Sequence, residues 1–230
     1  MNVLPSSRPP CQRAGVLPIL FQDSRFVVLD KPAGLPVHPG RGGGPSVEDW
    51  FPLLSRRRDG PWLAHRLDAD TSGCLVVALR RAALHAAQEA FASGQAGKVY
   101  WAVVQGRPHA DRGVVDAPLS KRNERTGWWM AIDPAGASAK TEWRILHAAT
   151  PRPDPGFTCL ELRPHTGRTH QIRVHCAHLG CPILGDPIYG DGKGRLQLLA
   201  RSIMLPLSPA LCATAPPPAH MIAALAACGL

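Results

Sequence analysis

The sequence predicts a mixed α+β domain, mainly because of how its apolar segments are spaced. Strand-like segments come before and after single helices, at the short intervals typical of hairpins. This favours an α+β domain over a regular parallel βαβ array. The composition also suits a folded domain with an ample core, because 45% of the 230 residues are hydrophobic and only 19% are charged.

The individual elements follow from local composition and from helix-capping residues. Segments rich in β-branched and aromatic residues are predicted as strands, at 25–29, 62–65, 73–78, 98–104, 141–147 and 157–163. Helices are predicted where apolar residues recur at helical spacing, over 46–54, 81–92, 169–180 and 221–228. Ser46 and Thr169 are the expected N-caps of the first and third helices. The turn-rich segment 107–137 receives no assignment.

Charge and composition limit the partners and the compartment. Lys and Arg number 26 against 17 Asp and Glu, so the net charge of +9 favours a polyanionic partner. Residues 1–15 lack an apolar signal core and predict a flexible tail before a domain spanning 16–230. No segment has the apolar length that crosses a bilayer. Seven scattered cysteines without C-x-x-C predict reduced thiols, so we expect a cytoplasmic protein without a membrane partner. Nothing in the sequence indicates an oligomer, so a monomer is the default expectation.

The densest candidate for chemistry is the polar connection between the predicted strands 62–65 and 73–78. It contains His65, Arg66, Asp68 and Asp70 within a few residues. A carboxylate on a short loop between two strands is held rigidly, which suits a nucleophile or a base. The alternative is an ordinary turn, because Asp, Ser, Thr and Gly all favour turns.

A second cluster, rich in Arg and His, lies over 163–175 at a predicted helix start. Helix N-termini attract anions, so this segment predicts an anion-binding surface, with a solvated basic face as the alternative. Arg173 lies beyond the first turn and close to the apolar stripe of the helix. A buried cation there needs a partner, and Asp68 is the predicted carboxylate.

A metal site is an alternative for the same region, because five potential ligands lie close together in the sequence: His170, His175, Cys176, His178 and Cys181. On a helix these side chains point in diverging directions, and neither paired C-x-x-C motifs nor H-E-x-x-H is present. The sequence therefore predicts no metal site. A serine nucleophile is also disfavoured, because no G-x-S-x-G occurs.

Three segments together resemble the RluA-type family of RNA pseudouridine synthases. They are KPAGLPVHPG (31–40), HRLDADTSGCLVVA (65–78) and LELRPHTGRTHQIRVHCAHLGCPILGDPIYG (160–190). Weaker similarities occur in KVYWAVVQG (98–106), AKTEW (139–143) and ARSIMLPLSP (200–209), all in the order of the family. The chain departs from the family at Ala69, where a basic residue often follows the aspartate. It also has too few residues before Phe21 for the N-terminal S4 domain of many relatives.

The resemblance implies a single catalytic domain with the pseudouridine synthase fold: a mixed, mostly antiparallel sheet flanked by helices, with a central cleft. It implies an isomerase that acts on specific uridines in structured RNA, ribosomal RNA or tRNA or both, without a cofactor or metal. Asp68 matches the essential aspartate and is the expected nucleophile. Tyr100 matches the active-site tyrosine, and Arg173 matches the arginine that pairs with the aspartate.

The resemblance and the positive charge also suggest which residues contact RNA. We expect contacts from basic and polar side chains of the matching segments: Lys31, His65, Arg66, Arg168, His170 and Gln171. Arg66 matches a residue that fills the space left by the flipped uridine, whereas His65 and Gln171 could instead hydrogen-bond within the fold. Arg41 and Lys193 are further candidates for phosphate contacts. The alternatives to an isomerase are an RNA-binding module without catalysis and a zinc-dependent hydrolase built around 170–181.

Overall fold

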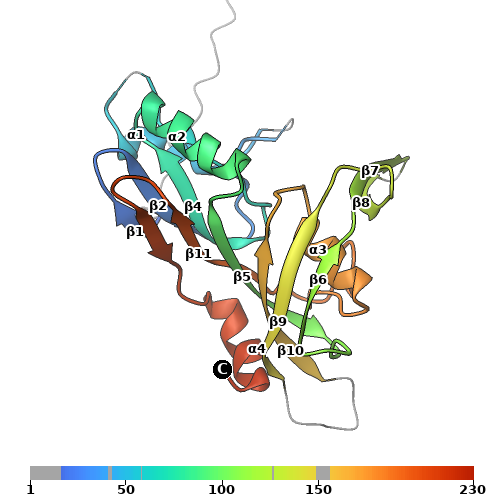
Figure 1. Cartoon of the computed structure of the whole chain (residues 1–230). Coiled ribbons are helices and arrows are strands. Elements are labelled where there is room, and N and C mark those ends of the chain that lie inside the picture. Colours follow the sequence, from blue (N-terminus) through green and yellow to red (C-terminus); the bar gives the residue numbers. More distant parts are fainter. Residues whose placement is uncertain (1–16, 41–42, 58, 126, 149–155) are drawn as a thin grey trace, which may run out of the picture.

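The structure is a computed structural model that describes residues 17–40, 43–57, 59–125, 127–148 and 156–230 (Figure 1). The predicted tail, residues 1–15, and Arg41 lie outside the described residues. The described residues form an α+β domain. Its main element is a ten-stranded sheet in which eight strands follow the order β1-β2-β4-β11-β5-β10-β9-β6, while β3 pairs with β4 and β12 pairs with β11. The ten strands are β1 (Ile19–Gln22), β2 (Phe26–Lys31), β3 (Trp62–Leu63), β4 (Ser72–Ala78), β5 (Gly97–Gln105), β6 (Arg112–Asp116), β9 (Lys140–Ala148), β10 (Phe157–Pro164), β11 (Leu198–Leu205) and β12 (Leu211–Thr214).

The sheet is antiparallel except at one seam near its middle. There β4 and β11 run parallel and are paired through Ser72 with Leu199 and through Gly73 with Ala200. Gly73 has φ +104°, and a Cβ at this position would lie 2.3 Å from the carbonyl oxygen of Ala200. Only glycine therefore allows the two strands to approach this closely. The seam divides the sheet into a first half, β1-β2-β4, and a second half, β11-β5-β10-β9-β6, which diverge in Figure 1.

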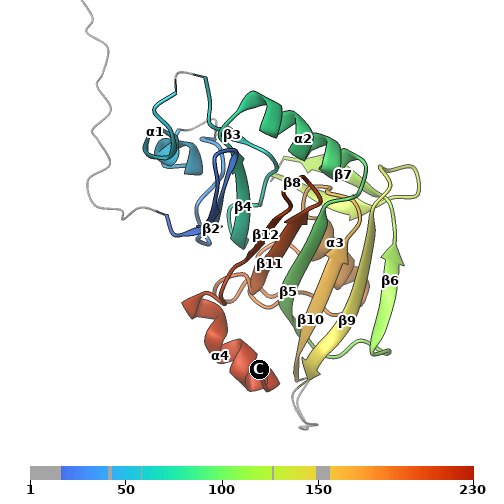
Figure 2. The same cartoon turned by 60° about the vertical axis from the view of Figure 1, so that its left-hand side comes forward.

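Helices cover the two halves of the sheet separately (Figure 2). The short 3₁₀ helix η1 (Val47–Trp50) leads into α1 (Phe51–Leu54), and α2 (Arg81–Ala92) packs on β3 and β4. On the second half, α3 (Gln171–His178) packs against β10, and α4 (Ala219–Cys228) packs against the same strand. None of the helices described is long and apolar enough to cross a membrane.

A separate two-stranded hairpin projects beside the second half. It consists of β7 (Leu119–Glu124) and β8 (Gly127–Ile132), and β8 contacts α3. The hairpin carries exposed basic and aromatic residues, and in Figure 1 it extends from the same side as α3. This places it beside the polar cluster at the start of α3.

Most predicted elements are confirmed, with three differences. The third helix spans Gln171–His178 rather than 169–180, and its N-cap is His170 rather than Thr169, in the left-handed conformation at φ 53°. Segment 107–137, which received no assignment, contains β6, β7 and β8. Strands β1, β11 and β12 were not predicted.

Candidate active site

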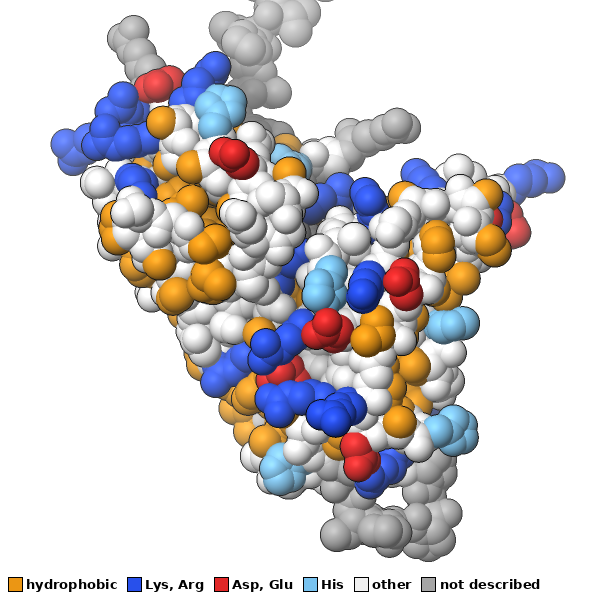
Figure 3. Space-filling model, in the orientation of Figure 1, with side chains coloured by type: hydrophobic (Ala, Val, Ile, Leu, Met, Phe, Trp, Pro, Cys, Tyr) orange, Lys and Arg blue, Asp and Glu red, His pale blue; other side chains and the backbone are white. Residues whose placement is uncertain are grey.

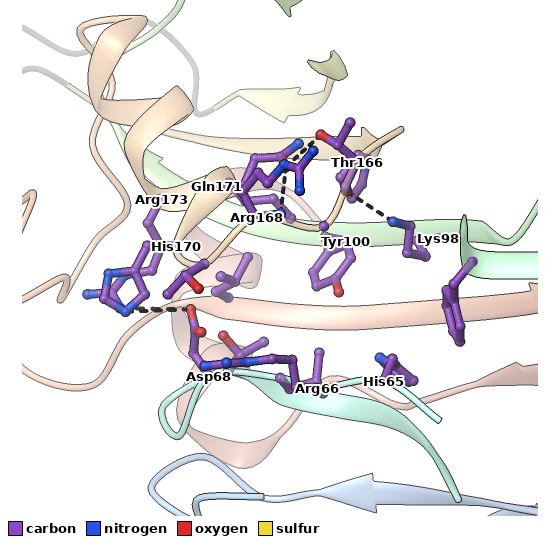
Figure 4. A pocket seen from close by; sticks show the side chains of 18 of the residues that line it. His65, Arg66, Asp68, Lys98, Tyr100, Thr166, Arg168, His170, Gln171 and Arg173 are labelled. Carbon is purple, nitrogen blue, oxygen red and sulfur yellow. Dashed lines mark hydrogen bonds and ion pairs between the residues drawn. The ribbon is translucent and has the colours of Figure 1, made fainter. Parts of the chain in front are cut away.

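Two hollows meet at Asp68, between the two halves of the sheet. The inner hollow has a volume of about 260 Å³ and is lined by Tyr100 and Lys98 (Figure 4). The outer hollow, of about 570 Å³, is lined by Trp128 of the hairpin. Five residues line both hollows: Arg66, Leu67, Asp68, His170 and Arg173. In Figure 3, Lys and Arg side chains are visible along the depression between the two halves.

Asp68 is held in place by the turn that joins β3 to β4. The backbone N–H of Thr71 donates to the carbonyl of Asp68 at 3.1 Å, and Gly34 donates to Ala69 at 2.9 Å. The Asp68 side chain is 20% exposed, and its Oδ2 lies 3.9 Å from Nη1 of Arg173 and 4.0 Å from Nε2 of His170. Its carboxylate therefore faces the cavity while two nitrogen-bearing side chains approach it from the start of α3.

Arg173 has a closer carboxylate partner than the predicted one. Its Nε and Nη2 donate to the two carboxylate oxygens of Asp186, both at 2.7 Å, and both side chains are buried. Burial would raise the pKa of Asp186, but the hydrogen bonds from Arg173 and from the N–H groups of Ile188 and Tyr189 hold it below its ordinary value. Asp68 is a second, looser partner of the same guanidinium at 3.9 Å, so the predicted ion pair is present, and Asp186 is an additional and closer partner that was not predicted.

Tyr100 lies on β5, opposite the Asp68 loop across the inner hollow (Figure 4). Burial is the main cause, and the nearby charge of Asp68 a further cause, of a pKa well above the ordinary tyrosine value. The hydroxyl is therefore protonated at neutral pH, and the ring offers an aromatic face to the cavity.

His170 connects Asp68 to the β7–β8 hairpin. Its ring stacks on Trp128 at a centroid distance of 5.0 Å, and its Nδ1 lies 2.9 Å from the hydroxyl of Tyr189, which accepts a hydrogen bond from the N–H of Met130. Burial lowers the pKa of His170, although the charge of Asp68 opposes this. A neutral ring that accepts the Tyr189 proton at Nδ1 carries its own proton on Nε2, the atom that faces Asp68.

Lys31 was predicted to contact RNA, but it is fully buried. Its ammonium donates to the backbone carbonyls of Pro32, Leu35 and Ala69 at 2.7–2.9 Å. A buried ammonium with three acceptors satisfies all its donors within the fold, so Lys31 ties the loop after β2 to the Asp68 loop.

His65 and Gln171 line the inner hollow, but their polar atoms are used within the fold. Nε2 of His65 accepts the N–H of Val76 at 3.0 Å, and burial lowers the pKa of His65 to about 4. The Gln171 amide is buried and makes four hydrogen bonds, to Thr166, the Arg168 N–H, the Lys140 carbonyl and Thr141. These internal hydrogen bonds favour the structural alternative for both side chains.

Arg66 and Arg168 are exposed at the edge of the cavity. Arg66 lines both hollows, and Nε of Arg168 donates to the Ser138 carbonyl at 3.0 Å. Lys193 is also exposed, but it lines neither hollow. Of these cations, Arg66 and Arg168 are in position to meet a ligand that enters the cavity.

Sequence reasoning missed four residues of the site: Lys98, Trp128, Asp186 and Tyr189. Lys98 carried a signal, because it lies two residues before Tyr100 on a predicted strand, and alternate strand residues share a face. Asp186 and Tyr189 lie in an irregular segment, and Trp128 lies in the unassigned one. Nothing in local composition places these three near Asp68.

The potential metal ligands of segment 170–181 do not form a metal site in the described part of the structure. Within the described ranges, no group of three or more His, Cys, Asp or Glu side chains is arranged to hold a metal ion. His175 instead hydrogen-bonds Thr141 and the Ala117 carbonyl, and Cys176 is buried in the core.

Comparison with known proteins gives a consistent result. The family model described as RNA pseudouridylate synthase matches residues 25–178. An uncharacterized RNA pseudouridine synthase of Zymomonas mobilis is 40% identical over 156 residues, which cover 67% of this chain and 69% of that protein. Ribosomal large subunit pseudouridine synthase C of Vibrio cholerae is 36% identical, and the match spans 67% of this chain but only 47% of that longer protein. The solved structure of human RNA pseudouridylate synthase domain containing 4 superposes with a TM-score of 0.76 at 30% identity, covering 92% of each chain.

Proposed function

The chain belongs to the RNA pseudouridylate synthase family, and from this membership we propose that it isomerises uridine in RNA to pseudouridine with Asp68 as the nucleophile. The observation that supports this role is the placement of Asp68 where the two hollows meet, on a loop fixed by backbone hydrogen bonds. A rigid loop of this kind presents a nucleophile in one orientation.

The proposed reaction balances with side chains alone. The N1–C1′ bond of the uridine breaks, the uracil turns while it remains in the cavity, and a C5–C1′ bond forms. The proton on C5 leaves and N1 gains one, so the reaction involves neither net oxidation nor hydrolysis. Asp68 acts on the sugar through a carboxylate oxygen, and Arg173 and His170 flank this carboxylate at 3.9 and 4.0 Å.

Tyr100 supplies the face against which the base packs. Because its pKa is raised, the hydroxyl remains a donor at neutral pH, which suits it to hydrogen-bond the turning uracil rather than to start as a base. A uridine inside an RNA fold must leave its stack to reach this cavity, which costs a few kcal/mol. Arg66, exposed beside both hollows, is positioned to occupy part of the vacated space.

For the substrate we propose ribosomal RNA. The support is the similarity to a protein named for the ribosomal large subunit. Mapping pseudouridines in cellular ribosomal RNA and tRNA with and without this protein tests the proposal. Sites lost only from tRNA would contradict it.

The test of the nucleophile is Asp68→Asn, which keeps the side-chain shape and removes the charge. We expect pseudouridine formation to fall by at least about 10³-fold, because covalent catalysis needs the carboxylate. The matched control is Asp70→Asn, an exposed carboxylate two residues away, which should retain most of the activity. If Asp68→Asn retained full activity, the nucleophile would be another group. If the wild-type protein bound RNA without forming pseudouridine, the RNA-binding module would be the better interpretation.

A further inference from the structure

We propose that Lys98 and Arg168 form a subsite for a backbone phosphate of the nucleotide that enters the inner hollow. This rests on the proposed function for the identity of the ligand as RNA, and it adds how the nucleotide is oriented over Asp68. Neither residue has a role in the chemistry described above.

Lys98 lines the same hollow as Tyr100. Lys98 and Tyr100 lie on β5 with one residue between them, so their side chains emerge on the same face and both line the inner hollow. Figure 4 shows Lys98 beside Tyr100, with Arg168 on the wall formed by the segment before α3 and Asp68 across the cavity. A nucleotide packed on the Tyr100 ring would therefore lie between the carboxylate and this pair of cations.

The positive charge of Lys98 has no carboxylate partner among the described residues. The Lys98 ammonium has three N–H donors and uses one of them, to the carbonyl of Thr166 at 3.0 Å. Among the described residues, no carboxylate lies within 4.0 Å of it, although burial lowers its pKa. A partly buried cation without a counter-ion is costly, and an anion that enters the cavity reduces this cost. Lys31, which is fully buried, differs because three carbonyls surround its ammonium.

Arg168 is held at the edge of the hollow by one hydrogen bond. Its Nε donates to the Ser138 carbonyl, which holds the side chain at the edge of the hollow while its terminal nitrogens remain available in the described part of the structure. A fixed guanidinium and an ammonium together suit the two free oxygens of a phosphodiester. Asp68 repels the same phosphate, so the two ends of the hollow favour one orientation of the nucleotide.

The first measurement is the affinity for a synthetic stem–loop RNA with one uridine in its loop, in the Asp68→Asn background to prevent turnover. We expect Lys98→Met to raise Kd by about ten-fold and to reduce the slope of log K against log salt by about 0.7–1, the value of one phosphate contact. Lys98→Arg should restore most of both. The charge-matched control is Arg107→Gln, an exposed arginine outside both hollows, which should change Kd less than about two-fold.

The second measurement separates a phosphate contact from a structural role. A neutral methylphosphonate replaces, one at a time, the phosphates on the 5′ and 3′ sides of the loop uridine. One replacement should weaken binding to the parent protein about ten-fold and have little further effect on Lys98→Met, since both changes remove the same interaction. Additive effects would overturn the proposal, as would indifference to both replacements, which would assign Lys98 to a uracil carbonyl. Indifference of the parent protein to both replacements overturns the proposal even if Lys98→Met fails to fold.

These outcomes are distinct from a failure of the proposed function. If Lys98 and one phosphate were coupled but the wild-type protein formed no pseudouridine, the proposed subsite would stand and the proposed enzymatic function would be wrong. If pseudouridine formation depended on Asp68 but Lys98 showed no coupling to either phosphate, the proposed enzymatic function would stand and the proposed subsite would be wrong.

Discussion

The guanidinium of Arg173 is fixed by Asp186, with two hydrogen bonds of 2.7 Å, and reaches Asp68 only at 3.9 Å. One buried carboxylate thus holds the arginine, and the arginine in turn stands beside the carboxylate that faces the cavity. The division suits the role proposed for Asp68, because a carboxylate bound as tightly as Asp186 would be a weaker nucleophile.

Asp186→Asn should therefore affect both stability and activity. The change leaves the buried Arg173 without its counter-ion, and we expect the free energy of unfolding to fall by about 3–5 kcal/mol. Pseudouridine formation should also fall, because Arg173 is then free to bind Asp68 directly or to move away. Urea unfolding and an activity assay measure the two effects. Asp191→Asn, an exposed aspartate five residues on, is the control and should change stability by less than about 1 kcal/mol.

His65 should make the protein less stable in mild acid. Its folded-state pKa is about 4, below the ordinary 6.5, so the unfolded chain binds more protons between these values. The stability it contributes is present above pH 6.5 and is lost as the pH falls toward 4, at up to about 1.4 kcal/mol per pH unit. Unfolding free energies across pH 4–7 should fall more steeply in wild type than in His65→Gln, which retains the contributions of the other buried titratable groups. His85→Gln, an exposed histidine on α2, should retain the wild-type slope.

Trp128 should matter more for activity than for stability. Its ring is 43% exposed and stacks on His170, which faces Asp68. An aromatic pair of this kind contributes about 0.5–1.5 kcal/mol, so Trp128→Ala should lower kcat/KM by about two- to ten-fold through a less ordered His170. Trp129→Ala is the neighbouring control, because Trp129 is half-buried and lines neither hollow. Equal losses in the two variants would show that the hairpin acts through its aromatic surface instead.

Gly73→Ala should be strongly destabilising. The added Cβ would meet the Ala200 carbonyl at the seam between β4 and β11, besides adopting an unfavourable φ. We expect a loss of about 2–4 kcal/mol in the free energy of unfolding. Gly94→Ala is the matched control, since Gly94 also has positive φ but open space around it, and it should cost only about 1–2 kcal/mol. Similar costs for both variants would mean that the close approach at the seam contributes little.

The sequence predicted the elements that have clear periodicity. Helix α2 matches its predicted range because its alanines recur at helical spacing, and β5, β9 and β10 match because their residues favour strands. The β7–β8 hairpin was missed because neither strand shows an apolar alternation: β7 is largely polar and exposed, whereas β8 is a continuous run of mostly apolar, half-buried residues. Strand β11 was missed although it lies at the centre of the sheet.

The candidate site shows the same limit. The loop with Asp68, the strand with Tyr100 and the helix with Arg173 could be found from their motifs, but their pairings could not. Sequence does not show that Lys31 would be fully buried against three carbonyls, since lysine is usually exposed. The choice of Asp186 over Asp68 as the main partner of Arg173 likewise depends on how an irregular segment folds back over α3.

The parallel seam has a consequence for where the site can exist. Asp68 belongs to the half of the sheet built before residue 80, whereas Tyr100 and Arg173 belong to the other half. Ser72 on one half meets Leu198 on the other across 126 positions of chain. Neither half contains all three residues, so the geometry of the proposed site is a property of the junction at which β4 and β11 meet.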